Sequence, residues 1–86
     1  MIFRAPGIVV QVQWIDAIIR AEVEEGDDIS PPTAITYGVV VKHNEDFISV
    51  AHEHFIDTEL KGQYRGVTTI PMGMVTLITN LWAPRA

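Results

Sequence analysis

Two histidines separated by one residue are the side chains best suited to metal chemistry. His52 and His54 flank Glu53, and residues two apart in a β-strand lie on the same face of the sheet. Two imidazoles at this spacing can chelate a divalent cation, with Asp57 as a third ligand. A complete site needs a third or fourth ligand from elsewhere, and the sequence shows no evident one. We therefore expect a surface or interface pair, with no metal and no cofactor, and keep the chelate as the alternative.

Residues that perform catalysis are not arranged in any familiar pattern. The sequence has no cysteine, no Gly-x-Ser-x-Gly motif and no glycine-rich phosphate-binding loop. The carboxylates Glu53 and Asp57 can face one another, but a carboxylate pair without a pocket is usually surface charge. We therefore expect the chain not to be an enzyme.

Five carboxylates gather between Glu22 and Asp28, beside the loop residues Gly26 and Ser30-Pro31-Pro32. Runs of like charge repel one another and stay solvated, which favours an exposed loop. The alternative is a calcium site, but the carboxylates lack the regular D-x-D-x-D-G spacing of a calcium loop.

One aromatic residue is a further candidate. Trp14 and Asp16 lie on the same side of a regular strand. A buried indole N–H needs an acceptor, so we expect Asp16 to accept the hydrogen bond of Trp14. The alternative is that Trp14 forms the aromatic floor of a ligand site.

The elements that position these residues are predicted to be β-strands, because β-branched and aromatic residues dominate the apolar runs. Tyr37–Phe55 predicts a hairpin around the polar loop His43–Asp46. Residues 17–25 are expected to extend the first strand and then fray into a loop, with a short helix as the alternative. The expected strands are residues 8–16, 37–42, 47–55, 67–71 and 75–81, with a polar connection over 57–66 and one 3₁₀ turn at Pro71-Met72-Gly73.

Five short strands in 86 residues predict an all-β fold, a small five-stranded antiparallel open barrel that forms a single domain over residues 1–86. Alternation with a period of two indicates which side chains face the core. The expected core residues are Val10, Val12, Trp14, Val39, Val41, Ile48, Val50, Ile70, Val75 and Leu77.

Charge and hydropathy restrict the partners. The formal net charge is −5, and the six basic residues are scattered, which makes DNA an unlikely partner and leaves open only a few-contact RNA role. The sequence has no apolar run of about 18 residues, so no membrane span is expected. Its beginning lacks the pattern of a signal peptide, so we expect a cytoplasmic protein.

Several short motifs carry a family resemblance. The strand order with a late 3₁₀ turn resembles that of small SH3-like and Sm-like barrels. The sequence is also similar to short phage-type proteins of unknown role in three motifs: Trp14-Ile15-Asp16-Ala17, Val39-Val40-Val41 and Ile70-Pro71-Met72-Gly73.

Sm-like proteins carry a D-x-F-M-N turn that stacks and reads a uridine, and an R-G turn near the last strand. Here Glu45-Asp46-Phe47-Ile48-Ser49 and Arg65-Gly66 are similar to these turns. The resemblance implies binding of single-stranded, uridine-rich RNA through Phe47, Ser49 and Arg65. Glu and Ser replace the family's Asp and Asn, so the base-reading amide is absent.

Two functions follow from these observations. One is a non-enzymatic ring-forming barrel that binds RNA, and the other is a phage-type accessory or adaptor protein that binds protein. Residues 67–70 and 75–79 carry no charge, whereas natural edge strands are usually protected by charge or proline. We therefore expect a homo-oligomer formed through these strand edges, which is also how Sm-like barrels close their rings.

Overall fold

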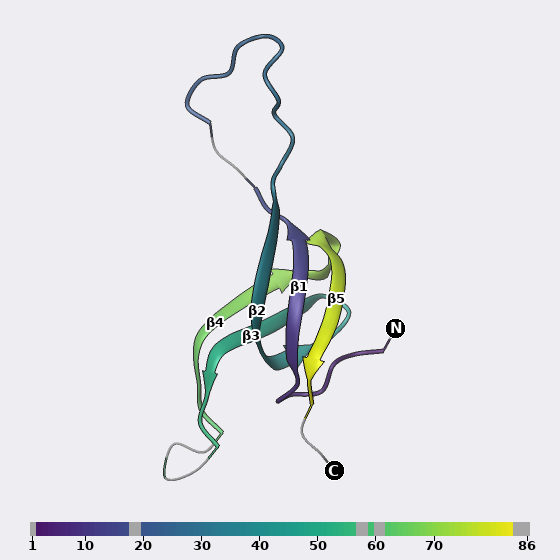
Figure 1. Cartoon of the computed structure of the whole chain (residues 1–86), viewed down its shortest axis with the longest axis vertical. Helices are drawn as coiled ribbons and strands as arrows, with labels where there is room; N and C mark the ends of the chain where they lie inside the picture. The colour runs from purple at the N-terminus through teal and green to yellow at the C-terminus, as the bar shows by residue number, and fades with distance from the viewer. Residues whose placement is uncertain (1, 18–19, 57–58, 60–61, 84–86) are drawn as a thin grey trace.

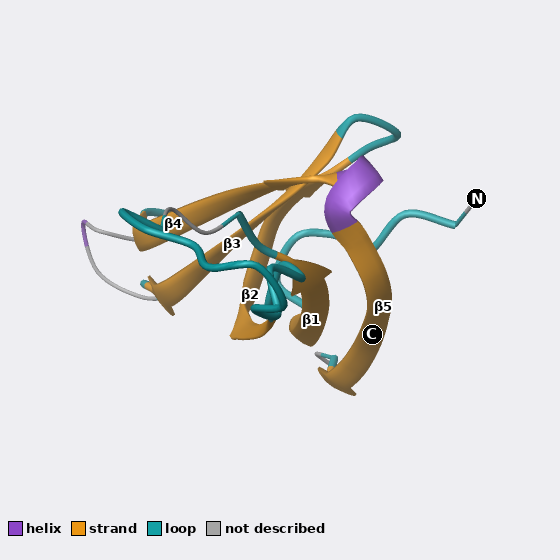
Figure 2. Ribbon diagram, turned by 90° about the horizontal axis from the view of Figure 1, so that it is seen from above, coloured by secondary structure: helices purple, strands orange, loops and turns teal. Residues whose placement is uncertain are grey.

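The chain folds into one open sheet of five antiparallel strands in the order β4-β3-β2-β1-β5 (Figure 1). The computed structural model describes residues 2–17, 20–56, 59 and 62–83. The strands are β1 (Val9–Ile15), β2 (Thr33–His43), β3 (Phe47–His54), β4 (Tyr64–Pro71) and β5 (Val75–Trp82), and the 3₁₀ turn η2 (Met72–Met74) joins β4 to β5. Viewed from above, the sheet curves strongly from β4 round to β5 (Figure 2). The predicted all-β class, the five antiparallel strands and the late 3₁₀ turn are confirmed.

The first strand ends sooner than the sequence predicted. Ala17 and residues 20–25 lie in a loop, so the expected extension of the strand is wrong for the described residues. Asp16 N–H donates to Pro32 O at 2.9 Å, just beyond the last strand pair, Ile15 with Thr33. An extended β1 would next pair with two consecutive prolines, Pro31 and Pro32, which have no N–H to donate. The chain therefore leaves the sheet here and forms a long loop that projects from it (Figure 1).

The central hairpin is confirmed, but its first strand begins at Thr33 and not at residue 37, because residues 33–36 pair with β1. Its loop is also one residue shorter than expected. His43 belongs to β2 and pairs with Ile48, so the loop consists of residues 44–46. Asn44 Oδ1 accepts hydrogen bonds from the N–H groups of Asp46 at 2.9 Å and Phe47 at 3.0 Å. An asparagine side chain that bonds the backbone two residues on stabilises a tight turn.

Strand β4 begins at Tyr64, so the expectation of a polar connection that includes residues 64–66 is wrong. Tyr64 pairs with His54, and their rings stack with centroids 4.3 Å apart at an interplanar angle of 12°. This stacked pair extends the β3–β4 hairpin beyond the apolar run on which the prediction rested.

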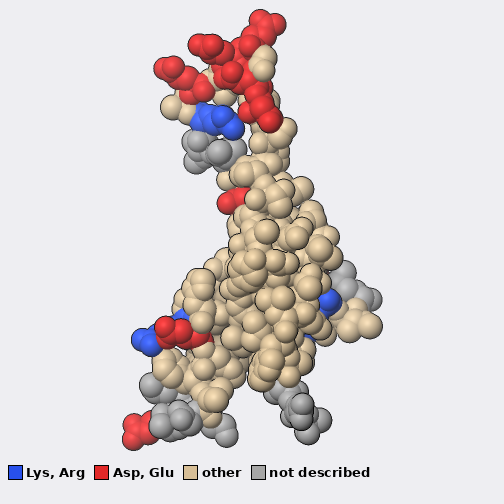
Figure 3. Space-filling view, viewed as in Figure 1, with Lys and Arg blue, Asp and Glu red and all other residues tan. Residues whose placement is uncertain are grey.

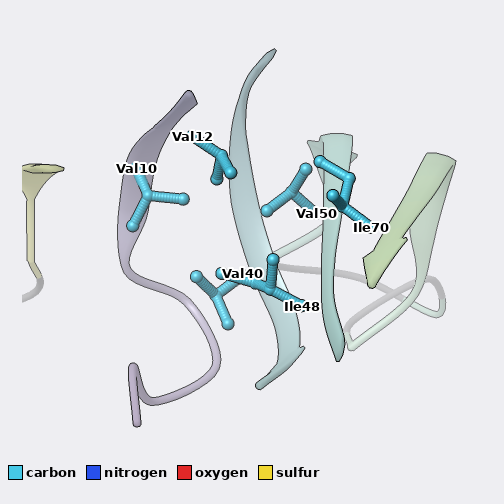
Figure 4. Close-up of a cluster of buried hydrophobic side chains, with 6 residues drawn as sticks. All are labelled: Val10, Val12, Val40, Ile48, Val50 and Ile70. Carbon is cyan, nitrogen blue, oxygen red and sulfur yellow. The ribbon is translucent and has the colours of Figure 1, made fainter. Parts of the chain in front are cut away.

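The core is a cluster of six aliphatic side chains on the inner face of the sheet (Figure 4). Its members are at most 2% exposed, and they are Val10, Val12, Val40, Ile48, Val50 and Ile70. Trp14 and Val75 are partly buried against this cluster, so seven of the ten expected core positions lie in it or pack on it.

The other three expected core residues, Val39, Val41 and Leu77, do not belong to the core. In β2 the register shifts between Val40 and Lys42, so Val40 faces inward and Val39 and Val41 are only half-buried. In β5 an irregularity opposite Gln13 and Trp14 leaves Leu77 half-exposed, while Ile78 packs on the core. A bulge adds one residue to a strand and thereby reverses which face the later side chains occupy.

Candidate functional surfaces

The three residues implied in RNA binding do not form one site. Phe47 begins β3, half-buried, and Ser49 follows it two residues on, 7% exposed. Arg65 pairs with Glu53, six residues further along β3 than Phe47, which corresponds to a separation of about 20 Å along an extended strand. The structure therefore places Phe47 and Ser49 together and Arg65 at the other end of the β3–β4 hairpin.

Arg65 is engaged by neighbours on its own hairpin. Its Nη2 and Nε lie 2.7 and 3.0 Å from Glu53 Oε2, and its guanidinium carbon lies 4.8 Å from the centre of the Phe55 ring. Both members of the ion pair are more than half exposed, so the pair contributes only about 0–1 kcal/mol to stability. It nevertheless partly neutralises the charge that RNA phosphates would need.

The hydroxyl of Ser49 is also engaged in a hydrogen bond within the sheet. Its hydroxyl lies 2.7 Å from the hydroxyl of its cross-strand partner Thr69. Phe47 keeps a cation beside it, since Lys42 Nζ lies 6.0 Å from the centre of its ring. Of the three predicted RNA-binding residues, Phe47 is therefore the one with both free surface and a nearby positive charge.

The two histidines lie on β3 but meet different neighbours. His54 stacks on Tyr64, whereas His52 is exposed and lies beside Gly66. Asp57, the suggested third ligand, lies outside the described residues. Within the part of the chain that the structure describes, no group of three or more histidine, aspartate or glutamate side chains is arranged to hold a metal ion.

Trp14 has an acceptor other than the predicted one. Its Nε1–H donates to Thr36 Oγ1 at 2.9 Å, while Asp16 Oδ1 accepts the N–H of Ala17 at 2.8 Å. The expectation that Asp16 accepts from the indole is wrong, because the chain turns out of the sheet at Asp16.

The acidic residues 22–28 lie in the projecting loop, which appears as the red end of the molecule in Figure 3. All the described residues of this loop from Arg20 to Pro32 are exposed. Hydrogen bonds from the backbone and side chain of Ser30 lower the pKa of Asp28 below its ordinary value, which keeps that carboxylate charged. The loop is a solvated feature, as the charge pattern predicted.

The outer face of β5, β1 and β2 (residues 33–41) is uncharged, because these segments contain no Asp, Glu, Lys or Arg. Figure 3 shows a broad uncharged area over them. Five large side chains on these strands are between 49% and 58% exposed, namely Ile35, Tyr37, Leu77, Leu81 and Trp82. Protein interfaces are depleted of charge at their centre and enriched in aromatic residues, so this face has the composition of a protein-binding surface.

Both outer strands of the sheet have a single neighbour. β4 pairs with β3 and β5 pairs with β1. From Val67 to Trp82 the chain carries no charged residue, so β5, and β4 beyond Arg65, have no charge of their own to prevent pairing with another chain.

Sequence reasoning missed a feature at the beginning of the chain. Residues 2–5, called here the N-terminal strap, contact both β2 and β5. Arg4 N–H donates to His43 Nδ1 at 2.8 Å, and its guanidinium donates to Asn80 Oδ1 at 2.9 Å and to Ile78 O at 3.1 Å. The Phe3 ring meets His43 edge-on with centroids 5.2 Å apart. No local pattern signals contacts between residues separated by 39 or 76 positions.

No family model, curated protein or solved structure matches this chain. The described residues enclose no pocket. They include no helix that is long and apolar enough to cross a membrane. The outer face, the strand edges and the strap are the surface features of the described residues that can bind a partner.

Proposed function

We propose that this chain is a non-enzymatic, SH3-like or Sm-like small barrel that binds other protein chains, beginning with copies of itself. The succession of five antiparallel strands along the chain, with the 3₁₀ turn between β4 and β5, supports the barrel assignment, because the resemblance rests on this succession and this turn. The role is that of an accessory or adaptor protein.

The observation that carries this proposal is the pair of outer strands, which carry no charged residue from Val67 to Trp82. Unpaired N–H and C=O groups on a strand recruit another strand unless charge, proline or a bulge prevents it. Pro71 is the last residue of β4. β5 contains no proline, and between the two register shifts of its pairing with β1 it runs regularly from Leu77 to Asn80. A second copy supplies the missing partner strand and covers the half-exposed Val67 and Leu77.

Charge favours a protein partner over a nucleic acid. The chain has a net charge of −5, and the loop of residues 20–32 concentrates carboxylates at one end of the molecule (Figure 3). Nucleic-acid affinity depends mostly on neutralising phosphates with Lys and Arg. The outer face has no such residue over β1 and β5, whereas its Tyr37 and Trp82 are of the types that dominate protein interfaces.

The test is the mass of the purified chain by native mass spectrometry and light scattering. We expect a wild-type oligomer, and we expect the double variant Thr69→Lys, Thr76→Lys to shift toward the monomer because it charges both edges. The double variant Ala21→Lys, Ser30→Lys adds the same charge in the long loop and should keep the wild-type mass. A wild-type chain that is monomeric at high concentration at both pH 7.5 and pH 5.5 contradicts the proposal, provided that circular dichroism shows a folded sheet.

RNA binding is a second candidate, favoured by one observation. Lys42 and Phe47 place a cation and a half-buried ring together at the end of the central hairpin. An aromatic ring with a neighbouring positive charge is the basic unit of single-strand binding. This candidate involves the hairpin end and leaves the edges free, so the two functions are separable by mutation.

A further inference from the structure

The hydrogen bond between the strap and His43 requires a neutral imidazole. Because His43 Nδ1 accepts the N–H of Arg4, this nitrogen carries no proton, and the neutral ring bears its proton on Nε2. The ring is 8% exposed, and Nε2 is buried without a hydrogen-bond partner among the described residues. Protonating the ring would place an N–H on Nδ1 directly opposite the Arg4 N–H. The bond to the strap and the charged imidazole therefore exclude one another.

The surroundings of His43 offer the charged ring no compensation. On the strap it meets the Phe3 ring and the positive charge of Arg4. On β3 its cross-strand partner is the apolar Ile48. Along its own strand Lys42 is directed to Phe47, and the carboxylates of the following turn, Glu45 and Asp46, are exposed.

These surroundings set the direction of the pH dependence. Burial, and then the charge of Arg4, hold the pKa of His43 below its usual value of 6.5. A strap that has left the ring removes the charge of Arg4 and part of the burial, which raises the pKa of His43 toward its usual value. The released state therefore takes up a proton more readily than the bound state. The bound state is fully favoured above pH 6.5 and loses ground as the pH falls, by up to about tenfold per pH unit.

The strap also occupies β5. The Arg4 guanidinium binds the carbonyl of Ile78 and the side chain of Asn80 on this outermost strand. When the strap leaves β5, the carbonyl of Ile78 and the side chain of Asn80 lose their bonds to Arg4. Both groups lie on the strand that the proposed self-association uses. The same residue thus connects the titrating ring to the edge.

We propose that the N-terminal strap is an acid-released latch that covers β5 and, once released, opens this edge to a strand of a second copy. The gating part of this proposal rests on the proposed function, because it needs an edge that recruits another copy. The latch itself rests only on the contacts of Arg4 and His43.

The latch is tested by NMR relaxation of the Phe3 and Arg4 amides at pH 7.5 and 5.5, with circular dichroism to verify the sheet at both values. We expect order parameters near 0.85 at pH 7.5 and below about 0.6 at pH 5.5. His43→Gln keeps a polar side chain that cannot titrate and should give the same values at both pH values. His52→Gln removes an exposed histidine and should behave like the wild type. A wild-type strap that stays rigid at pH 5.5, or a His43→Gln strap that loosens equally, overturns the latch.

Light scattering on the same samples tests the gating. We expect the wild-type mass to rise at pH 5.5 and the mass of His43→Gln to remain unchanged. Arg4→Ala, which cannot bind Ile78 O, should have the higher mass at both pH values. Strap release without a rise in mass overturns the gating. If no variant self-associates at either pH, the proposed function fails, and the relaxation data still decide whether the latch exists.

Discussion

The indole of Trp14 on β1 donates its hydrogen bond across the sheet to Thr36 on β2, at 2.9 Å. The two residues are diagonal neighbours, since Trp14 pairs with Ala34 and Thr36 pairs with Val12. Both lie on the inner face, where Val12 is fully buried. The bond fixes the large ring over the end of the core at which the long loop leaves the sheet.

Replacing Thr36 with valine should destabilise the fold by about 1 kcal/mol, because it leaves a partly buried indole N–H without its acceptor at nearly constant volume. The measurement is the free energy of unfolding in urea, followed by tryptophan fluorescence. Thr33→Val, on an exposed position of the same strand, is the matched control and should change stability by less than about 0.5 kcal/mol. Asp16→Asn should also leave the free energy of unfolding nearly unchanged. A larger loss of stability for Asp16→Asn than for Thr36→Val would indicate that Asp16 accepts the hydrogen bond of Trp14, as the sequence suggested.

The sequence was sufficient for the number and succession of the strands because they are β-branched and separated by clear loop signals, as in the central hairpin. It missed the end of β1 and the beginnings of β2 and β4, where polar residues or single apolar residues pair across the sheet. It failed where a strand changes face. Nothing in Val39-Val40-Val41 distinguishes an inward Val40 from inward neighbours, because all three residues are equally apolar. A bulge is a property of two paired strands. The alternation of apolar and polar residues in one strand therefore does not reveal where a bulge lies.

The candidate surfaces were predicted less well than the fold, for a related reason. The uncharged edges follow directly from composition, so residues 67–70 and 75–79 were identified correctly as parts of outer strands. The contact between Arg4 and His43 depends on how the sheet curves and brings the beginning of the chain onto β2 and β5. The curvature of the sheet arises from strand twist and bulges together. The hydrophobic pattern of the sequence predicts neither the degree of twist nor the positions of the bulges.

Gly66 is predicted to be irreplaceable in β4. Its φ is +67°, and a Cβ there would lie 2.8 Å from His52 Cδ2, so alanine meets both backbone strain and a clash. Gly66→Ala should lower the free energy of unfolding by more than 1 kcal/mol, on the order of the penalty for a left-handed non-glycine residue plus overpacking. Thermal and urea unfolding measure the loss.

Two variants make this prediction specific. Gly73→Ala in η2 has open space around the added Cβ and no positive φ, so it should be close to neutral. Adding His52→Ala to Gly66→Ala should recover part of the loss by removing the imidazole, but not the backbone strain. Full recovery would show that the positive φ of Gly66 costs nothing, and no recovery would show that the His52 contact is irrelevant.

RNA binding, if it occurs, should depend on Phe47 and be nearly independent of Arg65. The Phe47 ring has Lys42 beside it. Arg65 is paired with Glu53 at 2.7 Å and lies at the opposite end of the β3–β4 hairpin from Phe47. Stacking of one base on an aromatic ring contributes about 1–3 kcal/mol, so Phe47→Ala should weaken binding of a short uridine-rich strand by tenfold or more at low salt. Lys42→Gln should lower both the affinity and its salt dependence. Arg65→Gln should change affinity less than threefold.

Fluorescence anisotropy with a labelled oligouridine measures the affinities of these three variants. The edge double variant Thr69→Lys, Thr76→Lys should be assayed beside them. Equal losses for Phe47→Ala and Arg65→Gln would contradict the single hairpin-end site, and no measurable affinity of the wild type at low salt would remove RNA from the candidate functions.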